Sequence, residues 1–271
     1  MPVFWFAVSN TEEFDLQKAI FVFLILHLFV YPASNGYNSY YDRDTGSIGG
    51  LKNPPQPNKE LLALVNVFDS IAVLLSFLFV SPVFALMVMG YILISKAYSN
   101  DKIRLKKYPV IGAVAVTIFQ GAFVYLAVRL AMPNGIFSID FTYAFVSTLF
   151  LAGSYPLTQV YQHEQDQNRG DITLSLKLGI NRTFGFAKIF IGLGSALLLF
   201  LYFYEQRLGA LLIFLTASLP VLIYFNKWER KVHLNLNEAN FENTMMMNKI
   251  SSLSLSAAFI VILLTEKIKL F

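Results

Sequence analysis

Two stretches of the chain combine amide and acidic side chains at helical spacing. Asn38 and Asp42 are four residues apart, and Gln162 and Asp166 repeat that spacing later in the chain. Residues at i and i+4 share a helix face, so each pair offers an amide oxygen and a carboxylate to one cation if the helix continues there. Mg²⁺ prefers such ligands, with few carboxylates and the rest water and phosphate. The alternative is that these residues cap helix ends and face water.

The composition places these two stretches in a membrane protein. Of the 271 residues, 56% are apolar and only 14% are charged, whereas soluble domains carry about 25% charged residues. The 26 Phe, 14 Tyr and 2 Trp exclude a disordered chain. The absence of Cys excludes disulfides, a zinc–thiolate site and a thiol nucleophile. The net charge of +4 lies in loops between apolar segments, so we expect a lipid bilayer and no nucleic acid as partner.

Eight apolar segments are long enough to cross a bilayer core, which needs about 20 residues. They lack the polar stripe of a soluble amphipathic helix, and Pro, Gly and charge clusters mark their ends. No low-complexity tract or Pro/Ser linker divides the chain, so we expect one domain over residues 1–271. The expected spans are 16–37, 60–80, 82–98, 109–132, 140–161, 184–204, 208–225 and 250–267.

The N-terminal segment 2–8 is apolar but too short to cross a membrane. It lacks the basic n-region and the small-residue cleavage site of a secretory signal. We expect residues 1–9 to be either the end of an additional helix, which would precede the eight spans and bring their number to nine, or an interfacial anchor. In the first case the beginning of that helix is truncated.

The distribution of Lys and Arg predicts the orientation of the chain. Of the 21 basic residues, 16 lie in segments 38–59, 96–108, 162–188 and 226–249, which fall on one side if the spans are correct. Short loops rich in Lys and Arg are typical of the cytoplasmic side. We therefore expect both acidic motifs to be cytoplasmic.

The order of the motifs resembles a known family. The first reads Asn38-x3-Asp42-x3-Gly46, with Asp44 nearby, and the second reads Gln162-x3-Asp166-x3-Gly170-x2-Thr173. These resemble the two signatures of the UbiA superfamily of intramembrane prenyltransferases, in which Asp stands at the positions of Gly46 and Gln162. The segments Lys52-Asn53-Pro54 and Tyr98–Pro109 also resemble family sequence.

The resemblance implies an all-α bundle of eight to nine transmembrane helices around a central cavity, and Mg²⁺-dependent transfer of a prenyl group. The partners would be a polyprenyl diphosphate and a lipophilic or aromatic acceptor, in a multi-pass protein of, for example, a bacterial inner membrane. The implied catalytic residues are Asn38, Asp42 and Asp166. The implied metal ligands are Asn38, Asp42, Asp44, Gln162 and Asp166. The implied substrate-binding residues are Arg43, Lys52, Tyr98, Lys102, Arg104 and Lys106.

Two alternatives stay open. The chain resembles a scaffold that would also suit a terpene cyclase. A non-enzymatic transporter of small or isoprenoid molecules would instead use Asp69, which lies in the middle of a span. An acid at that depth should face the bundle interior or water, as part of an acceptor site or as one partner of a structural pair.

Overall fold

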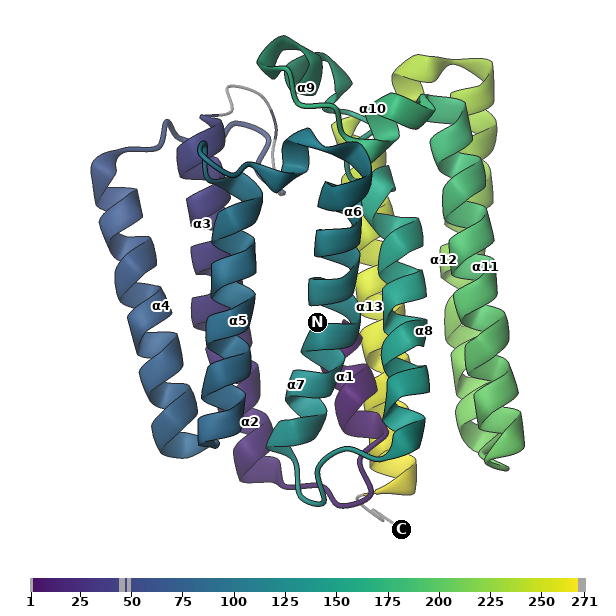
Figure 1. Cartoon of the computed structure of the whole chain (residues 1–271). Helices are drawn as coiled ribbons and strands as arrows, with labels where there is room; N and C mark the ends of the chain where they lie inside the picture. The colour runs from purple at the N-terminus through teal and green to yellow at the C-terminus, as the bar shows by residue number, and fades with distance from the viewer. Residues whose placement is uncertain (1, 44–46, 48–49, 268–271) are drawn as a thin grey trace.

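The computed structural model describes residues 2–43, 47 and 50–267, and the regular structure in these residues is helical (Figure 1). Long helices run side by side and are linked at the two ends of a bundle. The elements before the second acidic motif are α1 Pro2–Ser9, α2 Leu16–Leu24, η1 Ile25–Val30, α3 Tyr31–Asp42, α4 Lys59–Phe79, α5 Pro82–Ser99, η2 Leu105–Lys107, α6 Pro109–Thr117, η3 Ile118–Phe123, α7 Val124–Ala131 and α8 Ser138–Leu157. The remaining elements are α9 His163–Arg169, α10 Leu174–Leu178, α11 Ile180–Tyr204, α12 Leu208–Leu234, η4 Leu236–Glu238 and α13 Phe241–Glu266.

Among the described residues, seven continuous helical segments are long and apolar enough to cross a membrane. Two of them are composite, because α2, η1 and α3 form one rod and α6, η3 and α7 form another. The seven match seven of the eight expected spans. The eighth, expected at 140–161, is α8, which is not among the seven and which carries Asp140 and several Ser and Thr side chains among its apolar residues. An all-helical membrane bundle is confirmed, and the count of eight to nine spans stays a prediction.

The helices extend further than the expected spans at the end that holds the acidic motifs. Helix α12 continues to Leu234, and α13 begins at Phe241 after the Asn240 side chain accepts a hydrogen bond from the Asn243 backbone N–H. The expectation of a loop over 226–249 is therefore wrong for most of that segment. No Pro or Gly interrupts these polar turns, so the backbone stays helical beyond the apolar residues.

Two π-helical segments, η1 and η3, interrupt the composite rods. Segment η1 ends two residues before Pro32, which has no N–H to donate to the preceding turn. Segment η3 contains Gly121, where a Cβ atom would lie 2.8 Å from the Thr148 Cα of α8. Only glycine allows this close approach, and the Thr148 hydroxyl accepts a hydrogen bond from the Ala122 N–H at 3.2 Å. Segment η3 contributes Phe119 and Gln120 to the wall of the central cavity described below.

The short helix α1 lies inside the bundle, against α7 and α13, rather than at a membrane surface (Figure 1). Phe6 is buried, and its ring contacts those of Tyr125, Tyr143 and Phe259. The apolar N-terminal segment therefore belongs to the core of the structure.

Both acidic motifs lie at the same end of the bundle. Helix α3 ends there, and η2, α9 and α10 cover that end, whereas the links from α1 to α2 and from α7 to α8 lie at the opposite end (Figure 1). The span order thus brings together segments more than a hundred residues apart. Which side of the membrane this end faces stays a prediction.

Candidate active site

A cavity of about 1370 Å³ lies inside the helix bundle. Long helices on every side contribute to it, and α9 contributes at the end that holds the acidic motifs. The charged side chains on its wall, within the described residues, are Asp42, Lys106, Asp166, Arg169 and Lys188. All but Lys188 come from α3, η2 and α9. The cavity therefore has one charged end and a largely neutral interior.

Asn38 and Asp42 occupy the last two turns of α3 and both line the cavity. The Ser99 hydroxyl at the end of α5 donates a hydrogen bond to Asn38 Oδ1 at 2.6 Å. Asp42 is buried, and the Lys106 ammonium donates to its carboxylate. Helix α3 stops directly afterwards, because Arg43 has a left-handed backbone with φ 49°. The four-residue spacing places both side chains on one helix face, as predicted.

Gln162 and Asp166 also line the cavity, the first from the N-cap position of the short helix α9 and the second from within that helix. The Asp166 backbone N–H donates to the Gln162 carbonyl at 2.9 Å, so the spacing is helical here too. The Thr173 hydroxyl donates to Asp166 Oδ2 at 3.0 Å and fixes that carboxylate. Gly170 ends α9 with φ 72°, which allows the chain to turn back and bring Thr173 to Asp166. The Gly and Thr of the second motif thus shape the loop that holds its acid.

Arg104 and Lys106 form a partly buried cationic layer next to Asp42. Arg104 donates from Nε and Nη2 to the two oxygens of Asp171, at 2.8 Å each. Lys106 Nζ lies 3.7 Å from the same carboxylate, and Arg104 Nη2 lies 3.7 Å from Asp42 Oδ1. The hydrogen bonds to Asp171 raise the pKa of the Arg104 guanidinium, which therefore stays charged. Two cations and two carboxylates alternate here at contact distance.

Arg169 and two tyrosines connect the two acidic motifs. Arg169 Nη1, on α9, lies 3.9 Å from Asp42 Oδ1 on α3. The Tyr98 hydroxyl lies 2.5 Å from that of Tyr155, and both tyrosines line the cavity together with Asp42 and Asp166. All of these side chains line the cavity. The motifs therefore face one shared volume.

The structure separates the predicted site residues into three groups. On the cavity wall are Asn38, Asp42, Tyr98, Lys106, Gln162 and Asp166. Arg104 lies behind that wall, held by Asp171. Arg43, Lys52 and Lys102 do not line the cavity, and Lys52 instead pairs with Glu242 at 2.6 Å on the surface. Asp44 and Gly46 lie outside the described residues.

Three residues of the charged end were not predicted from the sequence, namely Asp171, Arg169 and Tyr155. Asp171 and Arg169 adjoin Gly170 inside the second motif, which is the only signal that marks them in the sequence. The side chain of Asp171 is 3% exposed, and its burial depends on Arg104, 67 residues away in the sequence. Pairing across that separation cannot be read from local spacing.

The donors at the charged end fit Mg²⁺ bound together with a diphosphate. Within the described residues, no three His, Cys, Asp or Glu side chains gather as a metal cluster. The end does offer two carboxylates, Asp42 and Asp166, with the amide oxygens of Asn38 and Gln162 on the same cavity wall. Mg²⁺ is usually held by one or two carboxylates and completed by substrate phosphate and water. The set is therefore suited to a metal that arrives with a phosphorylated substrate.

Asp69 does not line the main cavity. Its carboxylate lies 2.7 Å from Lys96 Nζ, which also donates to Asn66 Oδ1 at 3.0 Å. Of the two readings that the sequence left open, the structure supports the paired structural acid. A partly buried acid with a cationic partner avoids the penalty of an unpaired charge in the membrane.

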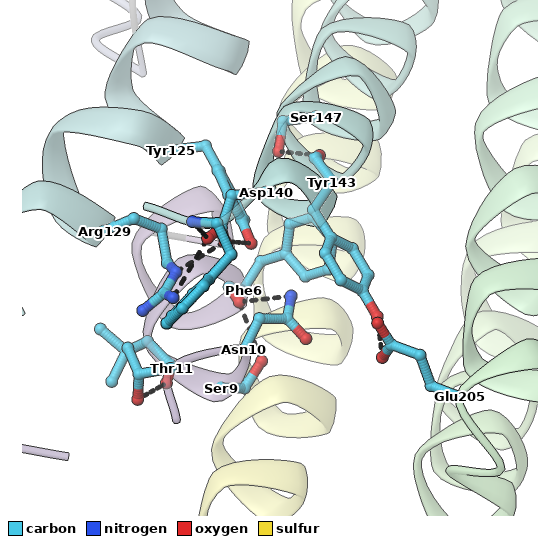
Figure 2. Close-up of polar contacts among 12 residues, drawn as sticks. Phe6, Ser9, Asn10, Thr11, Tyr125, Arg129, Asp140, Tyr143, Ser147 and Glu205 are labelled. Carbon is cyan, nitrogen blue, oxygen red and sulfur yellow. Dashed lines mark hydrogen bonds and ion pairs between the residues drawn. The ribbon is translucent and has the colours of Figure 1, made fainter. Parts of the chain in front are cut away.

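The far end of the bundle is held by a buried ion pair (Figure 2). Arg129 donates from Nε to Asp140 Oδ1 at 2.7 Å, and the Tyr125 hydroxyl donates to the same oxygen at 3.0 Å. The Phe137 backbone N–H donates to Asp140 Oδ2 at 2.9 Å. Both charged side chains are 1% exposed, so this cluster joins the end of α7 to the start of α8 without access to the cavity.

A second polar cluster lies beside it and centres on Arg207. This guanidinium donates to Glu266 at 2.7 Å and to Asn10 at 2.7 Å. Nearby, the Tyr143 hydroxyl donates to Glu205 at 2.5 Å (Figure 2). These contacts tie the α1–α2 link, the α11–α12 link and the end of α13 together. The charged end of the cavity thus lies at one end of the bundle, and interhelical polar contacts join the helices at the opposite end.

Comparison with known proteins supports the fold and places the chain in a family. The structure is similar to a UbiA homolog from Archaeoglobus fulgidus bound to DMAPP and Mg²⁺, with 17% identity, a TM-score of 0.67 and 96% and 94% of the two chains covered. The same values hold for the complex of that homolog with GPP and Mg²⁺. A structure described as digeranylgeranylglyceryl phosphate synthase gives 19% identity, a TM-score of 0.63 and coverage of 97% and 92%. No curated protein matches the sequence. The family model for the UbiA prenyltransferase family matches residues 1–250, and the chain belongs to that family.

Proposed function

We propose that the protein transfers a prenyl group from a prenyl diphosphate to an acceptor inside the membrane. The observation that carries this proposal is the meeting of Asn38, Asp42 and Asp166 with Lys106 and Arg169 at one end of a large, mostly apolar cavity. A prenyl diphosphate has the same division, with an anionic head and a hydrocarbon tail. The head matches the charged end and the tail matches the neutral interior. The related structures with DMAPP or GPP and Mg²⁺ support this choice of substrate.

The transfer exchanges one bond for another. The bond between C1 of the prenyl group and the diphosphate oxygen breaks, and its electron pair leaves with pyrophosphate. A nucleophilic oxygen or carbon of the acceptor bonds to C1, and the displaced proton goes to the released pyrophosphate. Mg²⁺ held by Asp42 and Asp166, with Asn38 and Gln162, would act as a Lewis acid that stabilises the departing pyrophosphate.

The side chains of the protein supply charge compensation and water exclusion. Lys106 and Arg169 lie next to Asp42 and can share the negative charge of the diphosphate. Arg104 keeps the loop that carries Lys106 in place through its two hydrogen bonds to Asp171. The faces of Tyr98, Tyr155 and the deeper Phe side chains can stabilise positive charge that develops at C1.

The distribution of polar groups favours an enzyme over a transporter. Transporters place their substrate sites near the bilayer midplane, often where helices are broken. Here most charged residues of the cavity wall cluster at one end, and Asp69 forms an ion pair with Lys96. The far end is joined by the Arg129–Asp140 pair and by the contacts of Arg207. Among the described residues, no charged side chain of the far end lines the cavity.

The test is pyrophosphate release from a panel of prenyl diphosphates by the purified protein in lipid nanodiscs, with and without Mg²⁺ and acceptors. Release should require Mg²⁺ and should be lost in Asp42→Asn and in Asp166→Asn, because each leaves the metal with one anionic ligand. Glu13→Gln is the matched control, since Glu13 is exposed at the far end and should not matter. Activity that is indifferent to both Asp→Asn changes would remove the metal site, and with it the proposal.

A further inference from the structure

Four neutral polar side chains form a patch on the cavity wall below the charged end. They come from α3, α5 and η3, and we call them the neutral polar wall: Ser34, Tyr91, Ser95 and Gln120. Ser34 lies one helical turn below Asn38, which corresponds to about 6 Å along α3. The wall is therefore close to the expected position of the reacting C1 atom, and it is deeper in the membrane.

The side chains of this wall come from three helical segments. The hydroxyls of Ser34 and Ser95 are 2.5 Å apart, and the Tyr91 side chain lies beside Ser34 and Gln120. Several other serines on the cavity wall instead donate their hydroxyls to carbonyls of their own helix. Ser218, for example, donates to Phe214 at 2.7 Å. The neutral polar wall thus keeps hydrogen-bonding capacity directed toward the cavity, where an exposed carboxamide such as Gln120 can make up to four bonds.

Local backbone geometry also sets this wall apart. Gln120 belongs to the π-helical segment η3, and Ser34 follows four residues after the end of η1. Such segments interrupt the regular helical register and are frequent at functional sites. Gln120 is exposed on this wall, and an exposed polar group at membrane depth is unfavourable unless it meets a partner, which supports a polar ligand here.

An ion pair lies behind the wall. Ser34, Tyr91 and Ser95 border both the main cavity and a small pocket on the other side of the wall, which Asp69 and Lys96 also line. Lys96 Nζ lies 2.7 Å from the Asp69 carboxylate, so the positive charge of Lys96 is neutralised by Asp69 and is not available to a ligand in the main cavity. The remaining cation on the cavity wall, Lys188, is more than half exposed and is paired with Glu229 at 2.8 Å on the α11–α12 side. Within the described residues, this part of the cavity thus offers hydrogen bonds without an unpaired cation.

We propose that the neutral polar wall binds the acceptor, and that the acceptor is a neutral molecule carrying hydroxyl or carbonyl oxygens, such as an alcohol, a phenol or a hydroquinone. This inference rests on the proposed function. A carboxylate or phosphate on the acceptor would be buried next to Ser34, Tyr91 and Gln120 without a counter-charge, which is strongly unfavourable. A neutral hydroxyl or carbonyl oxygen of the acceptor would form hydrogen bonds with the neutral polar wall, close to the expected position of C1.

Matched acceptors test the inference with wild-type protein in nanodiscs. A hydroquinone and the same ring bearing a carboxylate are compared at fixed Mg²⁺ and prenyl diphosphate, with prenylated product and pyrophosphate both measured. We expect the neutral compound to be preferred at least 10-fold in kcat/KM. Preference for the carboxylate, or for a phosphate-bearing lipid alcohol, would overturn the inference. Absence of pyrophosphate release with every donor and acceptor would instead refute the proposed function.

Variants locate the binding contact. Gln120→Leu and Tyr91→Phe should each raise the acceptor KM about 3- to 10-fold, as expected for the loss of one neutral hydrogen bond. The KM for prenyl diphosphate should not change. Ser218→Ala is the control, because its hydroxyl is satisfied within its own helix. Gln120→Lys should shift the preference toward the carboxylate acceptor. Unchanged acceptor KM in both Gln120→Leu and Tyr91→Phe would place the acceptor elsewhere while leaving the transferase proposal intact.

Discussion

Replacing Asp171 by Asn tests whether this buried acid holds the cations of the charged end in place. Its carboxylate accepts two hydrogen bonds from Arg104 at 2.8 Å each and lies 3.7 Å from Lys106. Asparagine has nearly the same shape but only one acceptor oxygen, and its amide N–H group would face the guanidinium donors. The change therefore removes one hydrogen bond and the negative charge while the packing is kept.

The size of the effect follows from the contacts that remain. A hydrogen bond to a charged group contributes about 1.5–3 kcal/mol, and breaking a fully buried ion pair costs about 3–5 kcal/mol. Arg104 is 17% exposed and keeps Asp101 at 3.0 Å and Asp42 at 3.7 Å, so the lower part of this range applies. We expect Asp171→Asn to lower the free energy of unfolding by about 2 kcal/mol. We also expect the KM for prenyl diphosphate to rise about 10-fold, which corresponds to about 1.4 kcal/mol.

Asp101→Asn is the matched control, because Asp101 binds the same guanidinium but is 68% exposed. An exposed pair contributes at most about 1 kcal/mol, so this variant should remain close to wild type. Unfolding in mixed SDS micelles gives the stability difference, and amide hydrogen exchange over residues 101–107 reports whether the loop loosens. Equal unfolding free energies for the two variants would refute the assignment of Asp171 as the anchor of Arg104.

Three further predictions concern the metal, the orientation and the packing. Gln162→Asp should lower the Mg²⁺ concentration that gives half-maximal pyrophosphate release, because it adds a charged ligand; an unchanged Mg²⁺ titration would show that this position does not reach the metal. Lys52→Cys and Ile172→Cys, both exposed in a chain without native Cys, should react with an impermeant maleimide from the same side of sealed vesicles. Labelling from opposite sides would contradict a shared site. Gly121→Ala should destabilise the protein by about 1–3 kcal/mol, since its Cβ would lie 2.8 Å from the α8 backbone. Gly185→Ala, with open space around it, should not destabilise, and equal losses in the two would argue against close packing of η3 on α8.

Features that depend on local spacing were predictable from the sequence. The apolar segments locate seven membrane helices, because any helix that crosses a bilayer must satisfy its backbone internally and cover itself with apolar side chains. The pairs Asn38–Asp42 and Gln162–Asp166 share a helix face because the helical repeat fixes that outcome wherever the backbone is helical. The family suggested by the two motifs is confirmed by the family match.

Pairing between helices was decided by the tertiary structure. Nothing near Arg104 in the sequence indicates that its guanidinium donates to Asp171. Likewise, nothing near Asp69 shows whether this acid binds a ligand or forms an ion pair with Lys96. Lys52 fits the expected substrate-binding pattern, yet it lies on the surface with Glu242. The neutral polar wall likewise exists only because α3, α5 and η3 turn these side chains toward one cavity. Spacing along one helix is set by backbone geometry, whereas contacts between helices depend on how each helix is rotated and packed against its neighbours.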